Sequence, residues 1–140
     1  MRMIYEILND VNNASTKSER IDILRRNGRQ SLKNVLQGAF HPKIKFVVKS
    51  PISYKKQEVP PGMGYTNIDT ELKRIYLFVE GSKKVDPNLK LAKKINILTE
   101  LLEAMEPKEA EIFMNMILKD LKLKNITYDL VKEAFPNILP

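Results

Sequence analysis

The chain has 140 residues, one histidine, no cysteine and a formal net charge of +7. This length suits one compact domain, here taken as residues 1–140, with a single core. The lack of cysteine excludes disulfides and thiolate metal sites, and one histidine leaves no imidazole cluster, so we expect no metal and no cofactor. No run of about 18 apolar residues and no apolar signal core are present, which predicts a cytoplasmic protein without a membrane partner.

Three short helices are predicted in the first 40 residues. Apolar side chains at helical spacing predict a helix over residues 3–12. Thr16 and Glu19 have the spacing of a capping box and open a second helix, which Gly28 closes. A third helix begins near Gln30 and buries an apolar stripe that ends at Phe40.

The next segment is less regular. Pro42 favours the start of a short helix, although Val47 and Val48 also fit a strand. Residues 50–66 contain three prolines and two glycines, which predicts a long surface loop. Lys55 and Lys56 lie beside aromatic residues in this loop, a combination that suits contact with a nucleic-acid backbone; a merely connecting loop is the alternative.

Two further helices are predicted before residue 107. The first spans residues 69–80 and ends at Gly81. Leu77 and Phe78 fall outside its apolar stripe, which indicates burial on most sides or an exposed patch for a partner protein. The second begins at Asp86-Pro87 and is the longest. Lysines gather near its start, where they oppose the helix dipole, and an external anion such as a DNA phosphate would explain them.

The last third closes the domain. An apolar stripe predicts a helix from Pro107 to Leu121, and a basic turn follows it. Thr127 is the expected N-cap of a final helix that must end at Pro136. The sequence therefore predicts an all-α domain of about seven or eight helices, and the expected single core contains Ile7, Leu36, Leu98, Phe113, Ile117 and Leu121.

Positive charge is unevenly distributed along the sequence. Residues 1–60 hold 12 Lys and Arg against 5 Asp and Glu, whereas residues 61–140 hold 12 of each. Such asymmetry indicates a basic face for a polyanion, most often nucleic acid. A solvated lysine-rich surface is the alternative.

Arg25, Arg26 and Arg29 form the first candidate site, at the end of the second predicted helix and near Lys33. Guanidinium groups suit bidentate contact with phosphate oxygens. The alternative is structural: these side chains cap the helix dipole and pair with Glu19 or Asp22.

Both ends of the chain resemble the N-terminal DNA-binding domain of ATP-dependent DNA ligases, especially those of T-even-type bacteriophages. The resemblance rests on Ile7-Leu8-Asn9-Asp10, Ser15-Thr16-Lys17, Ile23-Leu24-x-x-Asn27 and Leu32-Lys33-x-Val35 at the start, and on Ile117-Leu118-x-Asp120-Leu121 and Phe135-Pro136-x-Ile138-Leu139-Pro140 at the end. Lys124-Asn125 replaces the glycine that the ligases usually have in the turn, and Asn is the best substitute at a left-handed position.

The resemblance implies duplex DNA as the partner, through a compact helical bundle that contacts the sugar-phosphate backbone. The expected contacts are Arg25, Arg26, Arg29, Lys33, Lys43, Lys45, Lys55, Lys56, Lys119, Lys122, Lys124 and Asn125, with the basic groups near residues 25–33 and 119–125 brought together by the fold. A bacteriophage origin would place the protein in the host cytoplasm.

We expect no enzymatic activity. The sequence has no Lys-x-Asp-Gly adenylation motif, no Walker A motif, no Gly-x-Ser-x-Gly elbow and no His-Glu-x-x-His motif. His41 suits a cap or a surface group, because no partner nucleophile accompanies it. A protein-interaction module, which would bind a phage replication or host protein, remains the alternative function.

Overall fold

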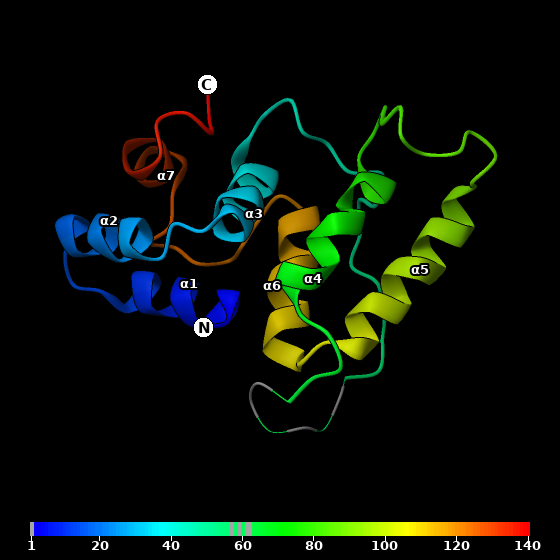
Figure 1. The fold of residues 1–140 in the computed structure, drawn as a ribbon, viewed down its shortest axis with the longest axis horizontal. Coiled ribbons are helices and arrows are strands. Elements are labelled where there is room, and N and C mark those ends of the chain that lie inside the picture. The colour runs from blue at the N-terminus through cyan, green and yellow to red at the C-terminus, as the bar shows by residue number, and fades with distance from the viewer. Residues whose placement is uncertain (1, 57, 59, 61–62) are drawn as a thin grey trace.

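The computed structural model describes residues 2–56, 58, 60 and 63–140, and within them it is helical, as predicted (Figure 1). The elements in chain order are α1 (Ile4–Asn13), α2 (Lys17–Arg26), α3 (Gln30–Phe40), α4 (Ile68–Glu71), the 3₁₀ helix η1 (Leu72–Phe78), α5 (Leu91–Ala104), α6 (Pro107–Ile117) and α7 (Tyr128–Ala134). None of the described helices is long and apolar enough to cross a membrane.

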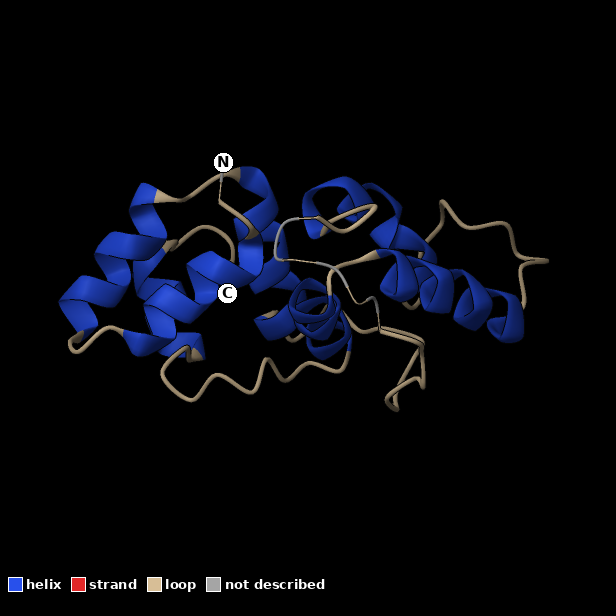
Figure 2. Cartoon of the chain, turned by 90° about the horizontal axis from the view of Figure 1, so that it is seen from below, coloured by secondary structure: helices blue, strands red, loops and turns tan. Residues whose placement is uncertain are grey.

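Helix α6 lies at the centre of the molecule. It packs against α1, α3, α4 and α5, and α2 packs against α1 and α7. Figure 2 shows the resulting elongated arrangement from below, with the helices of the first 40 residues on the left and α5 on the right. The six expected core residues are all buried in one cluster, which confirms that prediction.

Helix starts follow the sequence closely. The Thr16 hydroxyl accepts a hydrogen bond from the Glu19 N–H, and the Thr127 hydroxyl accepts one from the Leu130 N–H. Both hydroxyls therefore satisfy backbone donors that a helix start leaves unpaired. The final helix ends at Ala134, before Pro136, as expected.

The helix predicted after Pro42 is wrong. Segment 43–49 forms no helix: after a turn at residues 42–43, Phe46 makes an isolated bridge with Val79, the Val47 N–H donates to the Phe78 carbonyl at 2.7 Å, and the Glu80 N–H donates to the Lys45 carbonyl at 2.7 Å. Buried and exposed side chains alternate along this segment, and β-branched residues in it favour a strand. The strand alternative was therefore closer to the structure than the helix.

Three other boundaries differ from the expectation. Residues 69–80 divide into α4 and η1, and Phe78 is fully buried between elements rather than exposed. Helix α5 starts at Leu91, because the Asp86 carboxylate accepts the Asn88 N–H and forms a turn there instead of a helix cap.

The central helix stops at Ile117, four residues before the predicted end at Leu121. Lys119 and Lys122 adopt the left-handed conformation, with φ of 64° and 57°, and this conformation cannot continue a right-handed helix. The left-handed positions are therefore these two lysines and not Asn125, whose side chain instead donates to the Asn12 carbonyl at 2.7 Å.

Candidate nucleic-acid interface

The arginines of the first candidate site make internal contacts. Arg25 donates to the carbonyls of Glu133 and Ala134 at 3.1 and 3.2 Å, so it caps the end of α7. Arg26 forms an ion pair with Asp22 at 2.9 Å, the pairing that the structural alternative expected.

Arg29 is the most firmly held of the three. Its guanidinium makes two hydrogen bonds of 2.9 Å to the Asp69 carboxylate, and one of its nitrogens also donates to the Arg2 carbonyl at 2.7 Å. Burial opposes ionisation of Asp69, but hydrogen bonds from Arg29 and Ser31 outweigh it and lower its pKa. This pair fastens the start of α3 to α4 and leaves little of the guanidinium for a phosphate.

Lys33 and Asn125 also have internal partners. The Lys33 ammonium lies 5.4 Å from the centre of the Phe135 ring, within cation–π range. The Asn125 backbone N–H donates to the Asn12 side chain at 3.0 Å, in addition to the side-chain bond already described. Both residues therefore join the two ends of the chain.

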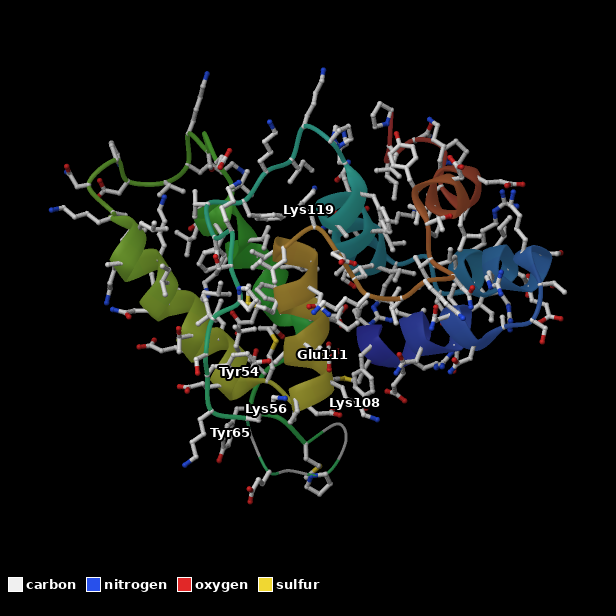
Figure 3. The ribbon with its side chains drawn as sticks, turned by 180° about the vertical axis from the view of Figure 1, so that it is seen from behind. Tyr54, Lys56, Tyr65, Lys108, Glu111 and Lys119 are labelled. Atoms are coloured by element: carbon white, nitrogen blue, oxygen red, sulfur yellow. The ribbon has the colours of Figure 1, made fainter. Side chains whose placement is uncertain are left out.

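Lys119 holds three backbone carbonyls. Its ammonium donates to Gly38 at 2.5 Å, to Ile44 at 2.7 Å and to His41 at 2.9 Å, and it lies 5.8 Å from the Phe46 ring centre. Desolvation lowers the pKa of Lys119 to about 8. Figure 3 shows this side chain where the segment after α3 passes the end of α6. Lys119 thus fixes the turn after α6 to that segment.

Arginine and lysine side chains differ in whether they have internal partners. Every arginine donates to an internal carboxylate or carbonyl. Among the described residues, the cationic side chains without an ion pair, a hydrogen bond or a ring contact are all lysines: Lys43, Lys45, Lys55, Lys56, Lys73, Lys83, Lys84, Lys90, Lys93, Lys94, Lys122 and Lys124.

Nine of these lysines lie on three adjoining segments, which we call the lysine edge: Lys43 and Lys45 (segment 41–49), Lys83, Lys84, Lys90, Lys93 and Lys94 (segment 79–94), and Lys122 and Lys124 (segment 118–125). Lys119 ties the third segment to the first, and the bonds between residues 45–47 and 78–80 tie the first to the second. In Figure 1 the first two segments run along the upper side of the molecule to the start of α5, whereas the third leaves the end of α6 and runs down toward α1.

Charge is concentrated on this edge. Its three segments contain 11 lysines and 3 acidic residues, a net charge of +8, whereas the rest of the chain holds 13 basic and 14 acidic residues. Glu80 is one of the three acids, and a hydrogen bond and ion pair with Lys49 lower its pKa. The edge therefore accounts for the whole positive charge of the protein.

The edge includes only part of the predicted site. Lys43, Lys45, Lys122 and Lys124 belong to it. Lys55 and Lys56 are instead exposed in the loop beside the end of α5, and Figure 3 shows Lys56 there, near the start of α6. No contact within the described residues joins the Arg25–Lys33 group to Lys122 or Lys124. The lysines of segment 79–94 were missed as site residues, although those at the start of α5 carried a signal by opposing the helix dipole.

Comparison with known proteins adds one finding. A protein-family model matches residues 7–125, and its description is "Family of unknown function (DUF6433)". No curated protein matches the chain.

Proposed function

We propose that this chain, which belongs to the family of unknown function DUF6433, is a non-catalytic protein that binds duplex DNA through its lysine edge. The observation that carries the proposal is the concentration of charge: three segments with a net charge of +8 on a molecule whose remainder is almost neutral. Positive charge gathered on adjoining segments of a domain is typical of a nucleic-acid surface.

The chemistry of the edge suits phosphates rather than bases. Lysine is a flexible point charge, whereas base recognition relies mostly on fixed forks such as arginine or on amides. The lysines at the start of α5 raise the energy of the free protein, because they oppose the helix dipole, and a bound phosphate would relieve that cost. We therefore expect binding with little dependence on sequence.

The ligase resemblance supports the same partner, with a different set of residues. The arginines that carried the first prediction stabilise the fold, so the proposal places DNA on the lysines instead. An exposed apolar patch around Leu77 or Phe78 would have favoured the rival function, a protein-interaction module. Phe78 is fully buried and Leu77 packs partly buried against the core, so that patch does not form.

A salt titration of duplex binding tests the proposal. If about four lysines contact phosphates together, the logarithm of the binding constant should fall against the logarithm of salt concentration with a slope near −4, since about 0.9 counterion is released per contact. Unrelated duplexes should give similar affinities. No salt-dependent binding at about 50 mM salt, where phosphate-driven affinity is high, would refute the proposal.

A matched pair of variants locates the surface. Changing Lys43, Lys83 and Lys84 to Gln should weaken binding and make the slope shallower, because these lysines lie on the edge. Changing Lys17, Lys55 and Lys56 to Gln removes the same charge elsewhere and should have a much smaller effect. Equal losses would mean that net charge, and not the edge, sets the affinity.

A further inference from the structure

The apolar face of α5 extends beyond the part that the core covers. Leu98, Leu101 and Leu102 are buried, and these three residues lie in the second half of the helix. Leu91 lies seven residues before Leu98, on the same face, yet it is 50% exposed. In Figure 1 the start of α5 reaches the right-hand edge of the molecule, beyond α6. Leu91 therefore presents an apolar side chain at a free end of the helix.

Positive charge surrounds this side chain. Lys90 and Lys94 are one helical turn apart and lie beside Leu91. Segment 83–94 as a whole contains five lysines and one acidic residue, so its net charge is +4. The start of α5 thus combines an apolar centre with a cationic rim.

The opposite end of α5 borders a hollow with the complementary character. The volume of the hollow is about 640 Å³, which leaves room for an apolar side chain and its neighbours, since pockets that hold whole ligands measure about 300–1,000 Å³. Its lining has three glutamates against two lysines, together with an aromatic ring and an alanine: Lys55, Lys56, Glu58, Tyr65, Glu100, Glu103 and Ala104. Figure 3 shows Tyr65 and Lys56 near this end of the helix.

The exposed ring of Tyr65 is held in place through its neighbours. The side chain is 89% exposed. The Thr66 N–H donates to the Ala104 carbonyl at 3.1 Å. Gly64 lies so close to the junction of α5 and α6 that an added Cβ would be 2.7 Å from the Glu106 nitrogen. The backbone on both sides of Tyr65 therefore packs against the helix end and directs the ring outward, as for an aromatic anchor of an interface.

We infer that the start of α5 in one copy of the chain docks into the hollow at the end of α5 in a second copy. Leu91 packs on Tyr65 and Ala104, and Lys90 faces Glu100. Leu91 and Tyr65 are two of the three exposed large apolar side chains among the described residues, and this contact covers both. At about 0.15 M salt the screening length is about 8 Å, so the overall positive charge of the chain opposes the contact only weakly.

The contact joins two different surfaces, so it does not close into a symmetric pair. The two ends of the 14-residue helix are about 20 Å apart, and each copy keeps one free start and one free hollow. Copies therefore add head to tail. Lys90 also belongs to the lysine edge, so a second copy and a bound duplex would exclude each other at the start of α5.

Sedimentation equilibrium at about 0.15 M salt, without DNA, tests the inference, and its outcome does not depend on the proposed function. We expect the average mass to rise from 16.2 kDa with concentration and to pass the mass of a dimer. Leu91→Ser and Tyr65→Ser, both at exposed positions that the fold does not need, should each weaken association about tenfold, as the loss of an interface anchor does. Met63→Ser, at an exposed position outside the lining, is the matched control and should have a much smaller effect.

A charge exchange tests which ends meet. Lys90→Glu and Glu100→Lys should each weaken association when measured alone, because each places like charges opposite one another. An equimolar mixture of the two variants should associate more strongly than either alone, since its contacts can join opposite charges. A constant mass of 16.2 kDa, a mass that stops at a dimer, normal association of Leu91→Ser and Tyr65→Ser, or a mixture no stronger than its components would overturn the inference.

Discussion

At the scale of single residues, a buried carboxylate connects helices in a way that the sequence did not indicate. Glu109 lies in the first turn of α6, and it is fully buried. Its two oxygens accept the Tyr5 N–H at 3.2 Å and the Ile68 N–H at 3.1 Å, at the starts of α1 and α4. One side chain thus joins three helix starts. Local spacing could not reveal this, since the partners lie 104 and 41 residues away.

Glu109 makes stability depend on pH. Burial raises its pKa from 4.5 to about 7, against the hydrogen bonds from Ile68 and Tyr5 that favour the charged form. Between these two values the folded chain binds more protons than the unfolded chain, so the free energy of unfolding should fall as pH rises from about 4.5 to about 7. Urea denaturation at several pH values measures this slope.

Glu109→Gln mimics the protonated carboxyl in charge and shape, and it should remove that slope. Glu111→Gln, on the exposed face of the same helix, is the control and should retain the slope. An unchanged slope in Glu109→Gln would show that another group titrates.

At the scale of the elements, the sequence predicted what depends on local chemistry. The starts of α2 and α7 and the end of α7 were correct, because a hydroxyl cap or a proline determines each. Segment 43–49 and the end of α6 were wrong, because distant partners decide them: residues 78–80 pair with the segment, and Lys119 turns back to residues 38–44. The arginines of the first candidate site were misjudged for the same reason, because they bind carboxylates and carbonyls that are distant in the sequence.

Helix α5 gives a prediction in which stability and binding change in opposite directions. Lys93 lies in its first turn, where a negative side chain is favoured. Lys93→Glu should raise the free energy of unfolding by about 0.3–1 kcal/mol through the helix dipole. The same change should weaken duplex binding, because it reverses a charge on the lysine edge.

Lys56→Glu is the matched control, with the same change of charge in the loop. It should leave stability nearly unchanged and weaken binding less. Denaturation and salt titration of the two variants provide both measurements. Tighter binding by Lys93→Glu would show that DNA does not reach the start of α5.

At the scale of the whole molecule, arginines and lysines have different roles. Arginines hold elements together, while nine of the 12 lysines without a partner among the described residues lie on the three segments of the lysine edge. The count along the sequence assigned the positive charge to residues 1–60, since it could not show which cations are neutralised by partners. Two of the three segments of the lysine edge lie beyond residue 60.

The proposed function includes a negative prediction at this scale. The purified protein should neither form a covalent lysyl-adenylate with ATP nor seal nicked DNA, because its sequence lacks the adenylation motif. Incubation with radiolabelled ATP followed by denaturing electrophoresis detects the adduct, and a ligase serves as the positive control. A labelled band would show a nucleotidyl-transfer activity and would contradict a purely binding role.

The bonds from Glu109 to Tyr5 and Ile68 also constrain how the protein is made. A ribosome releases α1 first, but the carboxylate that secures its start comes 104 residues later. The Asn12–Asn125 contact and the packing of α2 against α7 wait even longer. Local helices can form early, and α1 can meet α2, but the contacts of α1 with α6 and of α2 with α7 require a nearly complete chain. Nascent chains arrested before residue 107 should therefore remain open to proteases at α1 and α2.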